Sequence, residues 1–237
     1  MGLMTTTLWE YPSQHYTAAD GSQMQGDSKY VGATPSWVIW QLLSRYTKPG
    51  ETVLDPMCGS GTTLDVCKDL GRTGTGFDLI SYAKRSDIKP ADARKLPLTN
   101  DSVDFVFVDP PYSTHVNYSD DPRCIGKLDA AGEDSGHAYF GAMSKVISEM
   151  YRVLRPGRHM ALYVSDSFRV TQRAGKHVFT PIGFHLFSMM CELMQPVDII
   201  AVVRHNEKLT RGNYHKAAEE QNFYLRGFNY LFVMQKP

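Results

Sequence analysis

The residues whose types and spacing are best suited to chemistry are Asp109, Pro110, Pro111 and Tyr112. An exocyclic amino group on a nucleobase is a poor nucleophile because its lone pair is delocalised into the ring. The Asp109 carboxylate and the Pro110 carbonyl can each accept one of its N–H hydrogen bonds, which aims the lone pair at a methyl group without a covalent intermediate. The Tyr112 ring can stack on a flipped-out base. The alternative is a rigid turn, fixed by two prolines, that ends a core strand.

A glycine-containing turn earlier in the chain has the composition of a ligand-binding loop. Its residues are Asp55, Pro56, Met57, Cys58, Gly59, Ser60, Gly61, Thr62 and Thr63. Gly59 and Gly61 allow the backbone to approach a ligand closely, and the helix predicted after them presents unpaired N–H groups at its start. Such turns also need glycine for steric reasons alone, so the pair by itself is weak evidence. The GxxxxGK[ST] pattern of a triphosphate-binding loop does not occur in the sequence.

Two further acidic residues follow predicted strands. Asp78 ends the strand after the glycine turn, where a carboxylate can accept hydrogen bonds from two ribose hydroxyls. Asp92, followed by Ala93, comes after a plausible third strand and can meet the amino group of an adenine. Each acid taken singly is more often a turn residue than a ligand contact. Because they follow successive strands, the two together favour a nucleoside site.

The elements that must position these residues alternate between strands and helices. Strands are predicted at 52–55, 73–78, 103–108, 159–164, 197–203 and 230–234, and helices at 37–43, 61–70, 139–154 and 184–193. This alternation predicts an α/β fold in which helices cover both faces of a mostly parallel sheet. Ligands of such sheets bind beyond the carboxyl ends of the strands, where the strand order reverses. Asp55, Asp78 and Asp109 all follow strands and are expected at this edge.

Composition narrows the class of protein. The 237 residues include 42% hydrophobic and 21% charged residues, which is typical of a globular chain and excludes a disordered one. The formal net charge of zero argues against a protein that coats nucleic acid non-specifically. There is no apolar run of membrane-spanning length and no export signal, and the four cysteines lack CxxC spacing. We therefore expect a cytoplasmic protein without membrane contact, structural zinc or disulfide bonds.

The two motifs together resemble those of the S-adenosylmethionine-dependent N6-adenine and N4-cytosine amino-methyltransferases of DNA. Residues 55–63 match the cofactor loop of that family, and residues 109–112 match its Asp-Pro-Pro-Tyr motif. The resemblance extends over most of residues 30–236 and implies a Rossmann-like class I methyltransferase fold with a seven-stranded, mostly parallel sheet. It also implies that S-adenosylmethionine is the cofactor and that Thr34 and Pro35 lie near its methionine moiety. DNA is the favoured substrate, with adenine N6 ahead of cytosine N4.

The domain organisation leaves several functions open. Residues 1–29 are expected to form an irregular arm and residues 30–237 a single methyltransferase domain. No segment is long enough for a separate target-recognition region, so only the irregular stretches 113–136, 165–180 and 205–227 remain for that role. An RNA base, a protein glutamine and a catalytically inactive binding partner are the alternatives, and the oligomeric state is left open. Arg169, Arg173 and Lys176 are candidate phosphate contacts.

Overall fold

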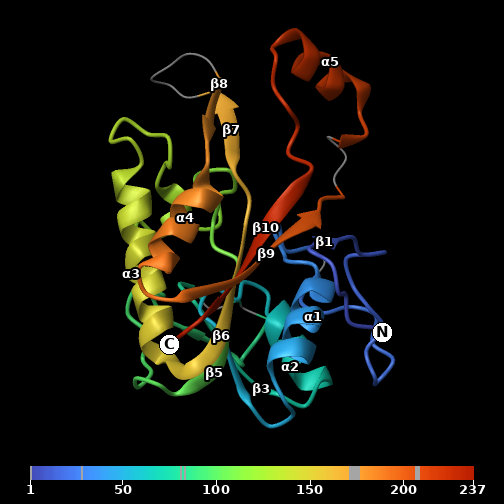
Figure 1. The fold of residues 1–237 in the computed structure, drawn as a ribbon, viewed down its shortest axis with the longest axis vertical. Coiled ribbons are helices and arrows are strands. Elements are labelled where there is room, and N and C mark those ends of the chain that lie inside the picture. The colour runs from blue at the N-terminus through green and yellow to red at the C-terminus, as the bar shows by residue number, and fades with distance from the viewer. Residues whose placement is uncertain (1, 28, 81, 83, 171–176, 206–208) are drawn as a thin grey trace.

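A mixed eight-stranded sheet forms the centre of the computed structural model, which describes residues 2–27, 29–80, 82, 84–170, 177–205 and 209–237 (Figure 1). The strand order is β1-β9-β10-β6-β5-β2-β3-β4. Their bounds are Leu8–Trp9 (β1), Thr52–Asp55 (β2), Thr73–Asp78 (β3), Ile88–Pro90 (β4), Val103–Val108 (β5), Leu154–Val164 (β6), Gln195–Val203 (β9) and Phe228–Gln235 (β10). Strand β10 is antiparallel to both of its neighbours, and the other pairings are parallel. The predicted mostly parallel α/β fold is confirmed.

Helices cover both faces of this sheet. Helices α1 (Ser36–Tyr46) and α2 (Thr62–Asp69) pack on one face, and α3 (His137–Val153) and α4 (Ile182–Cys191) pack on the other. Strand β5 is buried along its whole length because it lies between the two layers. A short 3₁₀ helix, η1 (Ile125–Lys127), precedes α3. Among the residues that the structure describes, no helix is both long and apolar enough to cross a bilayer.

The N-terminal arm contributes to the sheet, which the sequence did not predict. Leu8 and Trp9 form β1, which pairs in parallel with β9 and makes the eighth strand of a sheet expected to have seven. Trp9, Tyr11 and Tyr16 are buried in the core layer beneath α1. A strand of two residues is too short to show an alternating pattern, so nothing in the sequence distinguished it from a loop. The arm and the rest of the chain share one core.

Two segments expected to be irregular contain regular structure. Strands β7 (Ser167–Val170) and β8 (His177–Thr180) form an antiparallel hairpin, and α5 (Gly212–Glu220) lies in the connection from β9 to β10. Both project from the same end of the molecule, beyond the carboxyl end of β6 (Figure 1). The rings of Phe168 and Phe223 stack with centroids 4.6 Å apart and tie the two projections together. Of the predicted phosphate contacts, Arg173, Lys176 and the side chain of Arg169 lie outside the described residues.

Candidate active site

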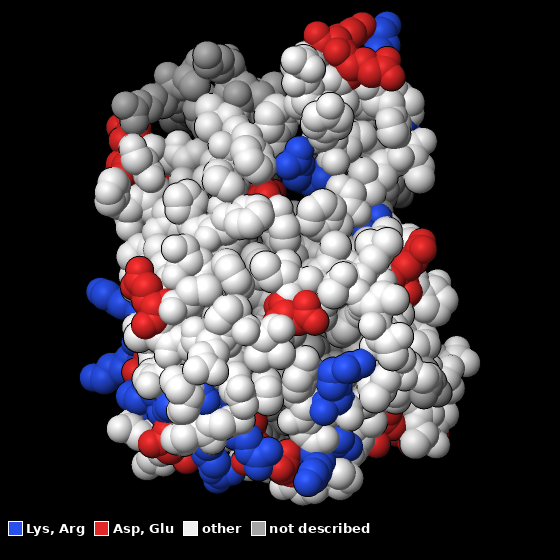
Figure 2. All heavy atoms as spheres, in the orientation of Figure 1, with Lys and Arg blue, Asp and Glu red and all other residues white. Residues whose placement is uncertain are grey.

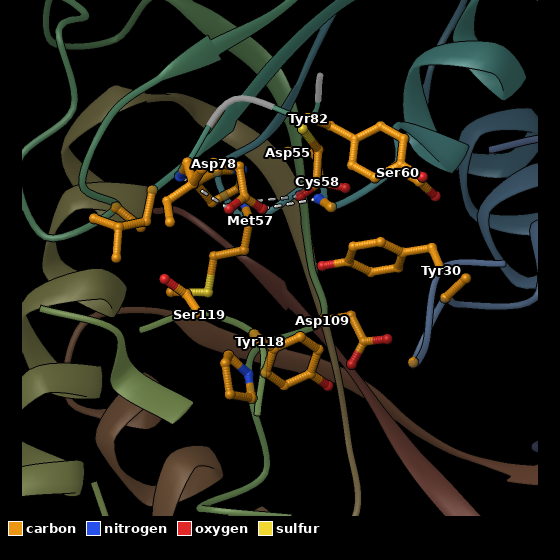
Figure 3. A pocket seen from close by; sticks show the side chains of 18 of the residues that line it. Tyr30, Asp55, Met57, Cys58, Ser60, Asp78, Tyr82, Asp109, Tyr118 and Ser119 are labelled. Atoms are coloured by element: carbon orange, nitrogen blue, oxygen red, sulfur yellow. Dashed lines mark hydrogen bonds between the residues drawn. The ribbon is translucent and has the colours of Figure 1, made fainter. Parts of the chain in front are cut away.

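The carboxyl ends of β2, β3 and β5 bring the predicted acids around one cavity of about 300 Å³ (Figure 3). Asp55, Asp78 and Asp109 each directly end or follow one of these strands, so the parallel arrangement places them at the same edge. The predicted residues that line the cavity are Thr34, Asp55, Pro56, Met57, Cys58, Gly59, Ser60, Thr62, Thr63, Asp78, Asp92, Ala93, Asp109 and Pro111. The predicted residues that do not line it are Pro35, Gly61, Pro110 and Tyr112.

Asp55 holds the glycine loop against the start of α2. Its carboxylate accepts a hydrogen bond from the Met57 N–H at 3.1 Å and another from the Thr63 hydroxyl. Burial raises the pKa of Asp55 to about 7, and these two hydrogen bonds oppose the rise. Gly61, with φ of 87°, begins the helix in a left-handed conformation that most residues avoid. Asp55 and Gly61 therefore fix the conformation of the glycine loop where it joins α2.

Asp78 connects the second strand to the glycine loop. Its Oδ2 accepts a hydrogen bond from the Gly59 N–H at 2.9 Å, and burial raises its pKa. Asp92 also faces the cavity but is paired with Arg94, whose guanidinium lies 2.6 Å from Oδ2 and lowers the pKa of Asp92. Asp78 also accepts a hydrogen bond from the Ile80 N–H at 3.5 Å, and among the described residues it differs from Asp92 in having no cationic partner.

Asp109 is held by two hydroxyl groups. Thr34 donates to Oδ2 and Tyr112 donates to Oδ1, both at 2.5 Å. Burial raises the pKa of Asp109 to about 7, although the hydrogen bonds from both hydroxyl groups act to lower it. The Tyr139 hydroxyl donates to the Pro111 carbonyl at 2.8 Å and fixes the turn. The Tyr112 ring packs against the core. In the structure, Tyr112 contacts the site through its hydroxyl, which orients Asp109.

Aromatic residues complete the cavity wall, and the sequence analysis did not single them out. Tyr30 and Tyr118 point into the cavity on either side of Asp109 (Figure 3). The ring of Tyr30 covers Gly59 and packs edge-on against Tyr82, with ring centroids 5.8 Å apart. These tyrosines lie in irregular loops, where no periodic pattern marks the residues that face a ligand. The only available signal was that Tyr30 opens the segment resembling the family.

The Tyr30 ring lies so close to Gly59 that a side chain at position 59 should destabilise the fold. Gly59 has φ of +51°, and a Cβ there would lie 2.7 Å from the Tyr30 ring. We expect Gly59→Ala to lower the free energy of unfolding by at least about 1 kcal/mol, since left-handed backbone is strained for alanine and the ring must move. Chemical denaturation measures this change.

Gly50→Ala is the matched control for this substitution. Gly50 has φ of +85° but nothing within 4 Å of an added Cβ, so the variant introduces backbone strain without a clash. An equal loss of stability in the two variants would contradict the inferred contact between Tyr30 and the loop.

Comparison with known proteins identifies the family. A family profile described as DNA methylase, of the N6/N4 methyltransferase type, matches residues 2–89 and 103–236. The chain belongs to the N6/N4 DNA methylase family. The match to the N6/N4 DNA methylase profile includes the arm, the glycine loop and the Asp109–Tyr112 motif, and it leaves out the segment that contains Asp92 and Ala93.

Individual relatives of this N6/N4 DNA methylase are distant. The type II methyltransferase M.HpaI from Haemophilus parainfluenzae is 30% identical over 78 residues, which is 33% of this chain and 23% of that protein. Among solved structures, a S-adenosylmethionine-dependent methyltransferase from Methanosarcina mazei is 14% identical with a TM-score of 0.51, covering 82% of this chain and 96% of that one. TrmN from Thermus thermophilus is 19% identical with a TM-score of 0.50, covering 85% and 48%. At these identities the solved structures establish the fold alone.

Proposed function

We propose that this N6/N4 DNA methylase transfers a methyl group from S-adenosylmethionine to the exocyclic amino group of a DNA base, adenine N6 or cytosine N4. The observation that carries the proposal is that Asp78 and Asp109 line the same cavity. A cofactor whose ribose meets Asp78 and whose methyl group faces Asp109 would use both ends of this cavity. Asp92 and Ala93 would lie near its adenine, and Thr34 near its methionine moiety.

The charge of the cavity suits this cofactor. Four carboxylates line it, from Asp55, Asp78, Asp92 and Asp109, whereas the one arginine among the lining residues, Arg123, is paired with Asp121. S-adenosylmethionine carries a positive sulfonium and a positive ammonium group, so carboxylates stabilise it by charge. When bound, it would supply an electrophilic methyl group at its sulfur. The residues of this chain then have to bind and orient the amine.

Asp109 and Pro110 would orient the target amine. In its ionised form the Asp109 carboxylate accepts hydrogen bonds only, so it can hold one N–H of the amine while the Pro110 carbonyl holds the other. This geometry directs the nitrogen lone pair toward the methyl group and needs no covalent intermediate. A Tyr112 ring that stacks on the base remains a prediction.

The hydroxyls of Thr34 and Tyr112 should matter for the rate of transfer through Asp109. We expect Thr34→Val and Tyr112→Phe each to lower kcat by roughly 10-fold, because each removes one of the hydrogen bonds that hold the carboxylate ionised and in place. The acid limb of the pH–rate profile should also move to higher pH, since both donors lower the pKa of Asp109. Steady-state kinetics across pH measure both effects. Unchanged kcat and an unmoved acid limb would contradict this positioning role.

The substrate polymer is tested by supplying labelled S-adenosylmethionine with separate pools of DNA, RNA and protein. We expect label in DNA, and digestion to nucleosides followed by mass spectrometry then distinguishes N6-methyladenine from N4-methylcytosine. Label in RNA or protein alone would overturn the proposed substrate.

We further propose that the arm and residues 30–237 act as one catalytic unit. The four cysteines, all unpaired, suit a reducing cytoplasm.

A further inference from the structure

Two arginines stand at the two ends of the connection from β9 to β10, which carries α5. Arg204 follows β9 and Arg226 precedes β10, and the Arg204 N–H donates to the Gly227 carbonyl at 2.9 Å. Both side chains are half-buried. In the described part of the chain neither one pairs with a carboxylate. These two positive charges are therefore not neutralised by the protein residues that the structure describes.

Three other arginines, one near the end of α3 and two on β6, differ from this pair. Arg152 binds Glu149 at 2.7 Å, and Arg155 binds Asp104 at 2.5 Å. Arg158 binds both Glu51 and Asp104. Their charges are paired with carboxylates near the amino end of β5, which is the sheet edge opposite Asp109. A partner of negative charge has no reason to bind them in preference to Arg204 and Arg226.

Arg204 lies in a row of polar side chains that leads to Asp109. The pairing of Val108 with Leu162 makes Asp109 a neighbour of Tyr163. The guanidinium of Arg204 reaches across β10 and donates to the Ser165 hydroxyl at 3.1 Å. Its positive charge also opposes the burial that raises the pKa of Asp109. Arg204 is thus close to the carboxylate that would hold the target amine.

Arg226 lies at the base of the two projections. Its guanidinium is 5.2 Å from the ring centroid of Phe179 on β8 and donates to the Tyr224 carbonyl at 2.7 Å, while its Nε is buried without a hydrogen-bond partner. A buried unpaired N–H is costly, so the geometry suits a ligand that accepts hydrogen bonds. Tyr224, whose carbonyl accepts the hydrogen bond from this guanidinium, is 83% exposed.

The shape and charge of this end agree with an elongated anionic partner. Figure 2 shows a hollow between the hairpin and the α5 segment, with basic atoms at its edge and acidic side chains gathered at the outer end of α5. Asp166 and Arg226 both influence the pKa of Tyr230, in opposite directions. The Asp166 carboxylate accepts hydrogen bonds from the Gly183 N–H and the Tyr230 hydroxyl. Arg204 and Arg226 therefore stand at the roots of the projections, near the carboxylate of Asp166, whereas the outer end of α5 is mainly acidic and its Lys216 pairs with Glu220.

We propose that Arg204 and Arg226 bind the DNA backbone phosphates that flank the target nucleotide, so that the hairpin and the α5 segment lie on either side of the strand. This inference rests on the proposed function. Arginine suits phosphate because its planar fork donates two parallel hydrogen bonds. Phosphate contacts fix the register of a nucleic acid on a protein without reading its sequence. Such contacts would bring the extruded base to Asp109.

The experiment compares Arg204→Met, Arg226→Met and Arg204→Lys with a matched control, Arg45→Met. Arg45 also lacks a carboxylate partner among the described residues, but it lies on α1 and binds only the Met4 carbonyl. Affinity for a fluorescein-labelled duplex DNA is measured by anisotropy over a series of salt concentrations. Thermal unfolding and calorimetric titration with S-adenosylmethionine establish that each variant is folded and retains the cofactor site.

We expect each methionine variant to bind DNA roughly 10-fold more weakly and to reduce the slope of log affinity against log salt by about 0.9, which corresponds to one lost phosphate contact. Arg204→Lys should keep the slope, and Arg45→Met should match the wild type. Methionine variants with wild-type affinity and slope, in an enzyme that methylates DNA, would overturn this inference alone. A wild-type protein that methylates no DNA would overturn the proposed function with it. Losses seen with duplex RNA and absent with DNA would overturn the choice of polymer.

Discussion

Asp109→Ala is expected to lower the single-turnover rate of methyl transfer by roughly 10²–10³-fold or more, which is the usual effect of removing one preorganised group that acts on the transition state. In the proposed mechanism Asp109 would touch the amine and not the ribose, so the affinity for S-adenosylmethionine should change little. Rapid-quench measurement with labelled cofactor gives the rate, and calorimetric titration gives the affinity. A near wild-type rate in this variant would refute the mechanism.

The pH dependence of the same step provides an independent check. Burial raises the pKa of Asp109 to about 7, and only the ionised carboxylate accepts both an N–H bond and the hydroxyl bonds around it. The rate should therefore fall as the pH drops through 7 and level off above it. Asp109→Asn, which cannot ionise, should show a low rate without this acid limb. An acid limb retained in Asp109→Asn would assign it to another group, with Asp55 as the candidate because its pKa is also about 7.

Asp78→Ala is expected to weaken binding of S-adenosylmethionine by on the order of 2–3 kcal/mol, since two ribose hydrogen bonds would be lost. The structure adds a second contribution, because Asp78 also accepts the Gly59 N–H and so holds the loop that faces the ligand. Asp78→Asn keeps an acceptor for Gly59 and separates the two contributions. Calorimetric titration of both variants measures them, and an affinity unchanged in Asp78→Ala would remove this residue from the cofactor site.

The sequence predicted the parts of the site that follow from strand ends. Asp55, Asp78 and Asp109 each directly end or follow a parallel strand, and parallel strands place their carboxyl ends at one edge whatever the details of packing. The glycine loop, residues 55–63, could be located for the same reason, because it follows the end of β2. These residues line one cavity, although their roles remain predictions.

The rest depended on tertiary contacts that leave no local pattern. Tyr30 and Tyr118 face the cavity from loops, where side-chain direction is set by what the loop packs against. The hydrogen bond from the Tyr112 hydroxyl to Asp109 was not predicted, whereas stacking of the Tyr112 ring on a base stays a prediction. Strand β1 required β9 as a partner, and the stacking of Phe168 on Phe223 joins two segments that the sequence could only describe as irregular.

The pairing of β1 with β9 also constrains the order in which the arm assembles during synthesis. Leu8 pairs with Ala201, so this pairing of the arm cannot form until residue 201 has left the ribosome. Tyr30 and Thr34, which form one wall of the cavity, lie between this late-docking strand and α1. A nascent chain ending before β9 would possess the glycine loop and Asp109 yet have no partner strand for β1. Contacts of the arm with α2, such as those of Ala19 with Asp69 and of Gly26 with Asp65, need no part of β9, so the β1–β9 pairing is the last link of the arm to form.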